Sequence, residues 1–219
     1  MHNSVKKYKD IISSIKSKFE DQKIIKLPKI IAVSKTFKLE KILPLIEYGH
    51  LDYGENKVQE AMEKWSEIKT KNPKIKLHLI GKLQTNKVKY AIKLFDYIHS
   101  VDSEKLAKKI SEEELKQNKK IKIFIQVNIG NEEQKSGVNK NEISNLYTYC
   151  KKLNLDIVGL MCIPPEKEDP DKYFKEMKLL NKKLNLYELS MGMSSDYLKA
   201  IENSSTYLRI GSSIFGKRY

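Results

Sequence analysis

Short apolar runs recur along the chain at intervals of roughly 25 residues, and each is followed by a segment in which apolar residues repeat with helical period. The runs predict β-strands at Ile30–Val33, Leu51–Tyr53, Leu77–Ile80, Tyr97–Val101, Ile121–Ile129, Ile157–Ile163, Tyr187–Met191 and Tyr207–Ile210. The segments between them predict helices at Leu39–Tyr48, Lys57–Ile68, Thr85–Leu94, Ser103–Gln117, Lys140–Leu153, Asp171–Leu184 and Asp196–Glu202. A further amphipathic helix, from about Val5 to Phe19, precedes the first strand.

The alternation of strands and helices determines the fold class that we expect. Strands joined by helical crossovers form a parallel sheet. The eight strand–helix units are what a closed (β/α)8 TIM barrel requires, and 219 residues lie near the lower end of its size range. The alternative is an open doubly wound sheet, which usually has fewer strands. No interdomain linker interrupts the pattern, so we predict a single α/β barrel domain over residues 1–219, with an extra N-terminal helix.

The composition is that of a folded protein in a reducing compartment. A 40% share of hydrophobic residues argues against disorder, although 32% of the residues are charged. The two cysteines, Cys150 and Cys162, cannot form a disulfide framework. The longest apolar run, Ile157–Ile163, is far too short to span a membrane, and the histidines show no metal-ligand spacing. We expect a cytoplasmic monomer with no signal peptide, no membrane contact and no metal site.

The charge balance raises a nucleic-acid hypothesis and then weakens it. The 42 basic and 28 acidic residues give a formal net charge of +14, which would attract a phosphate backbone. However, Arg209 and Arg218 are the only arginines, and arginine is the residue that reads bases and clamps phosphates. The lysines are spread along the whole chain, as on solvated helix faces. A nucleic-acid-binding module is therefore disfavoured, while a positive field still suits a small phosphorylated ligand.

Two glycine- and serine-rich loops follow the last two predicted strands. In barrels of this class the site lies at the carboxyl ends of the strands, and phosphate often binds after strands seven and eight. Ser194 and Ser195 directly precede a predicted helix, where they are expected to cap its N-terminus. Gly211 and Ser212 add donors from the next loop. Either loop alone is equally consistent with ordinary turn formation, but the two together predict a phosphate site.

Lys35 and Arg209 are the other candidate site residues. Lys35 follows the first apolar strand, and a lysine desolvated at a barrel mouth can act as an amine nucleophile toward carbonyls. The alternative is a strand-end lysine whose ammonium group extends into solvent. Arg209 ends the eighth strand of a chain dominated by lysine, which indicates a planar or bidentate contact. A structural ion pair in the barrel wall is equally consistent with that arginine. Phosphate, amine and guanidinium together suit pyridoxal 5′-phosphate.

Several motifs then carry a family resemblance over most of the chain. The segments Ala32–Thr36, Gly54–Glu60, His78–Lys87, Ser190–Ser194 and Arg209–Arg218, in this order, closely resemble the YggS/PROSC family of pyridoxal phosphate homeostasis proteins. The resemblance implies an alanine-racemase-like barrel that binds pyridoxal 5′-phosphate through a Schiff base on Lys35. It also implies that the cofactor is surrounded by Asn56, Ser194, Arg209, Gly211 and Ser212, with Arg209 toward the ring nitrogen.

Two further positions follow from the resemblance. Lys135, within Gln134–Val138, resembles a family lysine that takes part in handling the cofactor, and it ranks below Lys35. Family members often carry a basic residue two positions after the Schiff-base lysine, where this chain has Phe37. This departure puts a handover role for position 37 in doubt, and Lys38 is the nearest substitute.

The chemistry favours a carrier over an enzyme. Racemisation needs acid/base groups on both faces of the cofactor, and alanine racemases take one of them from a second, all-β domain. This sequence ends at Tyr219, directly after the eighth unit. An arginine at the ring nitrogen also weakens the cofactor as an electron sink. We therefore expect a non-catalytic protein of intracellular vitamin B6 homeostasis that supplies pyridoxal phosphate-dependent apoenzymes. A weak pyridoxal phosphate-dependent racemase or lyase is the alternative.

Overall fold

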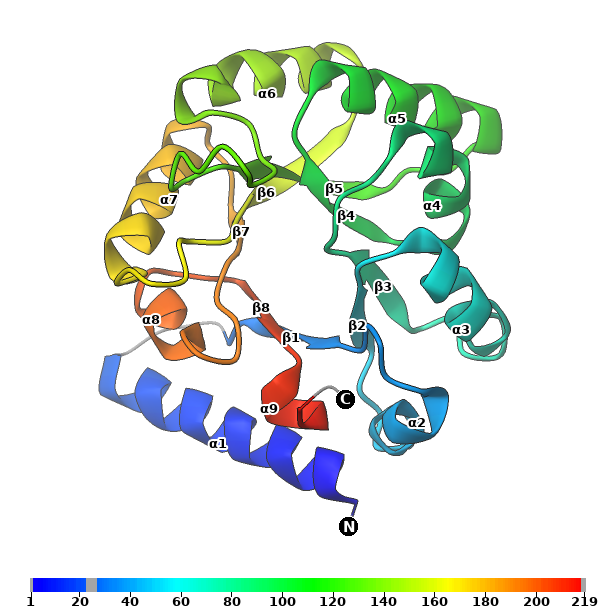
Figure 1. The fold of residues 1–219 in the computed structure, drawn as a ribbon, viewed down its shortest axis with the longest axis vertical. Coiled ribbons are helices and arrows are strands. Elements are labelled where there is room, and N and C mark those ends of the chain that lie inside the picture. The colour runs from blue at the N-terminus through cyan, green and yellow to red at the C-terminus, as the bar shows by residue number, and fades with distance from the viewer. Residues whose placement is uncertain (1, 23–26, 218–219) are drawn as a thin grey trace.

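The computed structural model describes residues 2–22 and 27–217, and the strands in this part of the chain close into one parallel barrel (Figure 1). They are β1 Lys29–Val33, β2 Asp52–Glu55, β3 Lys76–Leu79, β4 Tyr97–Val101, β5 Lys122–Val127, β6 Asp156–Cys162, β7 Glu188–Ser190 and β8 Tyr207–Ile210. Each strand pairs with the next in sequence, and β8 returns to β1 with Arg209 opposite Ile31. The predicted closed barrel is confirmed, and the open-sheet alternative is wrong.

Helices form a ring around the strands (Figure 1). They are α2 Leu39–Glu47, α3 Val58–Lys71, α4 Val88–Leu94, α5 Glu104–Gln117, α6 Ile143–Lys152, α7 Asp171–Lys183 and α8 Tyr197–Glu202, with 3-10 turns η1 Thr85–Lys87 and η2 Lys140–Glu142 before α4 and α6. The predicted N-terminal helix is confirmed as α1 Asn3–Gln22, which lies in the ring between α8 and α2. A short helix after β8, α9 Ser212–Phe215, was not predicted. Among the described residues, no helix is both long and apolar enough to cross a bilayer.

Side chains on successive strand positions enter two different cores, because they point to opposite faces of a strand. In β8, Leu208 and Ile210 pack outward against the helices, whereas Tyr207 belongs to an inner cluster with Ile31 and Phe124. The predicted packing of Trp65 in the outer layer is confirmed, since its side chain is fully buried. The outer layer is apolar and holds the helices on the barrel, while the interior mixes aromatic and polar groups.

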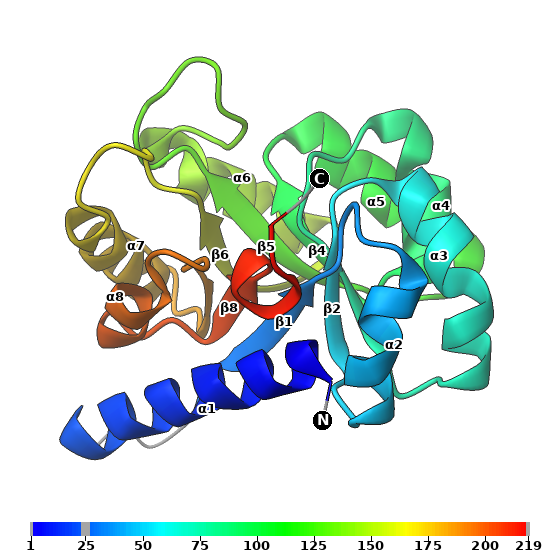
Figure 2. The ribbon, with the colours of Figure 1, turned by 60° about the horizontal axis from the view of Figure 1, so that its bottom comes forward.

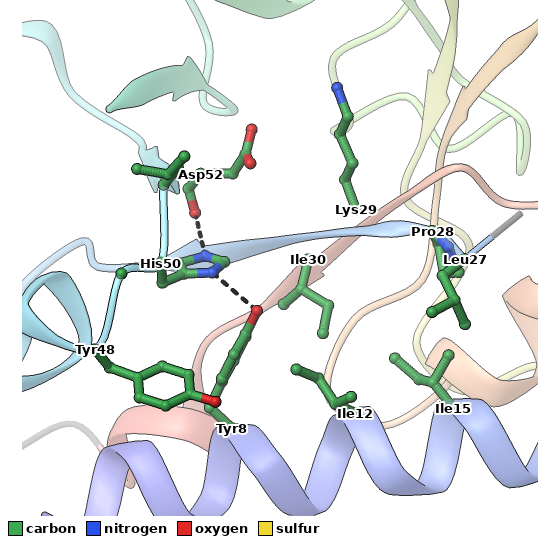
Figure 3. A pocket seen from close by; sticks show the side chains of 12 residues that line it. Tyr8, Ile12, Ile15, Leu27, Pro28, Lys29, Ile30, Tyr48, His50 and Asp52 are labelled. Carbon is green, nitrogen blue, oxygen red and sulfur yellow. Dashed lines mark hydrogen bonds between the residues drawn. The ribbon is translucent and has the colours of Figure 1, made fainter. Parts of the chain in front are cut away.

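The closure of a parallel barrel brings all carboxyl ends of the strands to one rim. The connection between β5 and α6, drawn in green in Figure 2, rises above the other loops of that rim. On the opposite side, α1 passes beside the amino ends of β1 and β2 (Figures 2 and 3). The barrel therefore has two chemically separate ends.

Candidate functional site

A cavity of about 730 Å³, here called the carboxyl-end cavity, opens among the loops that follow the strands. Its wall is formed by residues that follow or end β1, β2, β3, β5, β6, β7 and β8. All the site residues predicted from the sequence line this one cavity: Lys35, Asn56, Lys135, Ser194, Arg209, Gly211 and Ser212. The fold thus brings together groups that are up to 177 positions apart, as the numbers 35 and 212 show.

Lys35 lies in a tight turn directly after β1. Its side chain is half-buried, while the preceding Ser34 is fully buried. The next residue, Thr36, has φ of +67°, a left-handed conformation that is unfavourable for a β-branched residue. The Thr36 N–H donates to Glu60 Oε1 at 2.6 Å, which holds the turn in this conformation. The backbone at Lys35 is therefore constrained rather than free.

A buried platform formed by Glu55, Lys64 and Trp65 supports this turn. Glu55 Oε1 accepts hydrogen bonds from Ser34 Oγ at 2.7 Å and from Trp65 Nε1 at 2.9 Å. Lys64 Nζ donates to Ser34 O at 2.9 Å and also contacts Glu55 Oε1 at 3.0 Å. Sequence reasoning missed this platform, and its one sequence signal was a carboxylate, Glu55, two positions after the predicted strand Leu51–Tyr53. The platform fixes the backbone on the amino side of Lys35.

Glu60 completes the support on the other side of the turn. Lys64 Nζ donates to Glu60 Oε1 at 3.0 Å, the same oxygen that accepts from the Thr36 N–H. Burial alone would raise the pKa of Glu60, but the hydrogen bonds from Thr36 and Lys64 outweigh it and lower that pKa. Glu60 is therefore ionised at neutral pH and stays an acceptor for the strained Thr36 amide.

Asn56 reaches the cavity because the chain passes closely beside it. A Cβ atom at Gly81, in the loop after β3, would lie 2.3 Å from Asn56 O, so only glycine permits this approach. Ile80 and Lys82 flank Gly81 and line the cavity with it. The motif that contains Gly81 therefore closes the wall next to Asn56.

Arg209 lies at the base of the cavity with only 4% of its surface exposed. Its Nη1 donates to Ser190 O at 2.6 Å and to Ser190 Oγ at 2.8 Å, and its Nη2 donates to Cys162 O at 2.8 Å. These bonds use three of the five guanidinium N–H groups, and within the described residues no carboxylate pairs with it. Burial lowers the pKa of Arg209, yet guanidinium stays protonated in proteins. The ion-pair alternative is therefore wrong, and a planar cation faces the cavity.

The loops after β7 and β8 are joined, but not as the sequence predicted. The prediction that Ser194 and Ser195 cap α8 is wrong, because the N-cap residue is Asp196, whose Oδ1 accepts from the Met193 N–H at 2.5 Å. Ser194 Oγ instead accepts from the Ser213 N–H at 3.3 Å and links the two loops. Local spacing cannot reveal this bond because its partner is 19 residues away.

The joined loops present a set of unused backbone donors. Among the described residues, the N–H groups of Ser194, Ser195, Gly211 and Ser212 have no protein acceptor. All four residues line the carboxyl-end cavity. A cavity lined by several unused backbone N–H groups suits an anion.

Lys135 enters the cavity from the raised loop between β5 and α6. Its Nζ forms an ion pair with Glu132 Oε2 at 2.5 Å and donates to Pro164 O at 3.2 Å. Asn128 holds the loop by bonding the backbone N–H and C=O of Glu132 at 3.1 and 2.9 Å. Lys135 is thus paired at the rim of the cavity.

Phe37 does not take part in the cavity. Its side chain is buried and packs on Phe215 of α9 with ring centroids 5.3 Å apart. Lys38 is exposed and is not among the residues that line the cavity.

Sequence reasoning also missed Gln126, which lines the cavity from within β5 and donates to Ser136 O at 3.0 Å. Its one signal was a polar residue directly after the apolar run Ile123–Ile125.

The fold and cavity can now be compared with known proteins. Residues 15–219 match the family model described as alanine racemase, N-terminal domain, which is the class of barrel seen here. An alanine racemase from Clostridium difficile 630 shares the fold with a TM-score of 0.73 and 17% identity, over 93% of this chain and 54% of that one. The likeness to that enzyme therefore concerns the barrel alone.

More similar proteins narrow the family. A pyridoxal phosphate homeostasis protein from Aquifex aeolicus is 40% identical over 200 residues, which is 87% of each chain. The structure of PipY from Synechococcus elongatus without PLP has a TM-score of 0.86 at 30% identity, over 98% of this chain and 100% of that one. The PipY structure with PLP bound has a TM-score of 0.82 at 31% identity, over 92% and 100%. The chain belongs to the family of pyridoxal phosphate homeostasis proteins.

Proposed function

We propose that this protein binds pyridoxal 5′-phosphate covalently on Lys35 and acts in intracellular vitamin B6 homeostasis as a carrier and buffer of the cofactor. The observation that carries the proposal is the shared cavity, in which an amine, a buried guanidinium and four unused backbone N–H groups converge. These are the groups that an aldehyde, a pyridine nitrogen and a phosphate require. The named relatives and PLP-bound PipY support the same ligand.

The phosphate end of the ligand fits the joined loops after β7 and β8. The N–H groups of Ser194, Ser195, Gly211 and Ser212 would be the backbone donors available to the phosphate oxygens. Ser194 Oγ accepts from Ser213, so its own hydroxyl proton remains available for a phosphate oxygen. Lys82 on the cavity wall adds positive charge. The loops would therefore hold the phosphate through backbone hydrogen bonds, with Lys82 offsetting part of its charge.

Lys35 provides the covalent attachment. With pyridoxal phosphate bound, the Lys35 amine would be the group that holds its aldehyde carbon through a C=N bond, with loss of one water molecule. The braced turn of Ser34 and Thr36 keeps the lysine at the cavity wall, so little conformational entropy is lost on bonding. Asn56 flanks the cofactor, and Lys135 assists its handling from the rim once released from Glu132.

Arg209 favours storage over catalysis. The bound cofactor would be a stronger electron sink with its ring nitrogen protonated than with that nitrogen unprotonated. A guanidinium cation donates a hydrogen bond to that nitrogen and disfavours its protonation. We therefore propose that no residue of this chain acts as a strong catalyst. We further propose that residues 1–219 form one cofactor-binding domain. In this proposal the protein is a cytoplasmic monomer that passes pyridoxal phosphate to apoenzymes.

An absorbance titration tests the proposal. Pyridoxal phosphate added to the purified protein is expected to produce an absorbance band at about 420 nm that disappears on borohydride reduction. Peptide mass spectrometry of the reduced protein is expected to place the adduct on Lys35. Lys35→Ala should abolish the adduct. Lys82→Ala and Lys135→Ala remove lysines from the same cavity and should retain it. The absence of a band at excess cofactor would overturn the proposal.

Two other results would assign a different function. Turnover of amino acids that is lost in Lys35→Ala would make the protein a racemase or lyase rather than a carrier. Tight oligonucleotide binding that falls steeply with salt and survives Lys35→Ala would support the nucleic-acid hypothesis. The carrier instead predicts no turnover across an amino-acid panel and transfer of the cofactor to an apoenzyme.

A further inference from the structure

A continuous series of hydrogen bonds runs through the barrel interior to Arg209. It joins Asp52 Oδ1 to His78 Nε2 (3.0 Å), His78 Nδ1 to His99 Nε2 (3.0 Å), His99 Nδ1 to Ser190 Oγ (2.9 Å) and Ser190 Oγ to Arg209 Nη1 (2.8 Å). Asp52, His78, His99 and Ser190 are here called the interior chain. They come from β2, β3, β4 and β7 (Figure 1), and none of them lines the carboxyl-end cavity. Contact with the cofactor therefore does not explain them.

The partners determine where each proton of the interior chain lies. A guanidinium only donates, so Ser190 Oγ accepts from Arg209. With both histidines neutral, the Ser190 hydroxyl donates its hydrogen bond to His99 Nδ1. A carboxylate only accepts, so His78 Nε2 carries a proton toward Asp52. His99 then carries its proton on Nε2 and donates to His78 Nδ1. Every bond has one donor and one acceptor when both histidines are neutral, and all of them point from Arg209 toward Asp52.

Packing holds both imidazole rings in the required planes. His78 stacks on Tyr97 with centroids 4.3 Å apart and an interplanar angle of 12°, and His99 stacks on Phe124 at 4.3 Å and 18°. Both histidines are fully buried. Burial lowers the pKa of His78 despite the opposing Asp52 hydrogen bond, and it holds the pKa of His99 well below its usual value. The neutral, directed arrangement is therefore rigid.

We propose that the interior chain positions Arg209, holding its guanidinium group in one orientation toward the ring nitrogen of the bound cofactor. This role rests on the proposed function, because it requires a cofactor above Arg209. Ser190 Oγ is a better acceptor for Arg209 when its own proton is drawn toward His99, and each further bond adds to that polarisation. Asp52, at the far end of β2, supplies the negative charge that directs the whole series.

The first measurement is the tautomer of His78 and His99 in the cofactor-free protein, read by long-range ¹H–¹⁵N NMR. In the wild type both are expected to be neutral with the proton on Nε2. Asp52→Ala removes the terminal acceptor, so the Nδ1-protonated form should appear in both rings. Asp52→Asn keeps an accepting amide oxygen and should restore the wild-type tautomers.

The second measurement is the affinity for pyridoxal phosphate. Asp52→Ala and Ser190→Ala are expected to weaken it about tenfold, the usual effect of removing a partner that orients a binding group. Asp52→Asn should stay within about threefold of wild type. Tyr8→Phe alters the same end of the barrel as Asp52 without touching the interior chain, and should bind like wild type.

The proposal would be overturned if His78 or His99 of the wild type were doubly protonated or carried its proton on Nδ1. It would also be overturned if Asp52→Ala bound pyridoxal phosphate as tightly as wild type. If Asp52→Ala does not fold, wild-type affinity in Ser190→Ala would have the same consequence. A wild-type protein that takes up no cofactor would instead overturn the proposed function. The two failures are distinguishable because the tautomers are measured without cofactor.

Discussion

The barrel has a pocket at each end, and the two are chemically opposite. The amino-end pocket, of about 540 Å³, lies between α1 and the start of β1 and β2 (Figure 3). There Tyr8 OH donates to His50 Nδ1 at 3.0 Å, and His50 Nε2 donates to Asp52 O at 2.8 Å, so these polar groups satisfy one another. In the carboxyl-end cavity, four backbone N–H groups have no protein acceptor within the part of the chain that the structure describes. A group of unused backbone donors on two adjoining loops, rather than volume, distinguishes the carboxyl-end cavity.

The largest expected effect concerns the buried charge beneath the carboxyl-end cavity. Lys64→Met leaves the fully buried Glu55 carboxylate without its cation and should lower the free energy of unfolding by about 3 kcal/mol. Lys71→Met breaks the exposed pair with Glu67 and should leave stability unchanged. Urea unfolding measures the stability of both variants. Equal stabilities would contradict the supporting role of the platform formed by Glu55, Lys64 and Trp65.

Ser194→Ala tests whether the donors at the carboxyl end serve a phosphate. The variant loses a hydroxyl donor, so we expect about tenfold weaker binding of pyridoxal phosphate. Pyridoxal, which has no phosphate, is the matched control ligand and should bind wild type and variant equally. Fluorescence titration of both ligands provides the measurement. An equal loss for the two ligands would place the phosphate elsewhere.

In the amino-end pocket, His50 is expected to make the free energy of unfolding depend on pH. Burial lowers the pKa of His50, so the unfolded chain binds a proton more readily than the folded one. Stability from this group is complete above its unfolded pKa of about 6.5 and is lost as the pH falls below that value. Between about pH 7 and 5.5, the free energy of unfolding should therefore fall less in His50→Gln than in wild type, by a difference of up to about 1 kcal/mol. Denaturant unfolding at both pH values checks this, and identical losses would contradict it.

The smallest effect is expected from Tyr8→Phe. The variant removes one part-buried hydrogen bond to His50 and should lower the free energy of unfolding by about 0.5 kcal/mol. Its affinity for pyridoxal phosphate should equal that of wild type. Weaker cofactor binding in this variant would show that the two ends of the barrel are coupled outside the interior chain.

The strand and helix pattern was sufficient for the fold because burial imposes periodicity on the sequence. Residues such as Ile31 and Leu208 must be apolar wherever a strand is covered on both faces, and this requirement is local. The candidate site could be predicted from the fold, because a closed barrel places the residues at the carboxyl ends of all its strands at one rim. Lys35 and Arg209 were identified by position and by the rarity of arginine.

The platform, the interior chain and the short helix α9 could not be predicted. Glu55 meets Ser34 across 21 residues, and His99 meets Ser190 across 91, so no local spacing links the partners. The serines after β7 follow a capping pattern, yet Ser194 accepts from Ser213 because the two loops lie side by side. In each case the partner is chosen by barrel closure.

The sequence by itself determined the order of the elements, the buried faces of the strands and the residues that the rim presents. These properties depend on periodicity and on residue type at strand ends. The tertiary structure alone decided which donors remain unused, how Lys35 is braced and toward which group each histidine proton points. A hydrogen bond needs two partners in a fixed geometry, and only the closed barrel brings β2, β3, β4, β7 and β8 together.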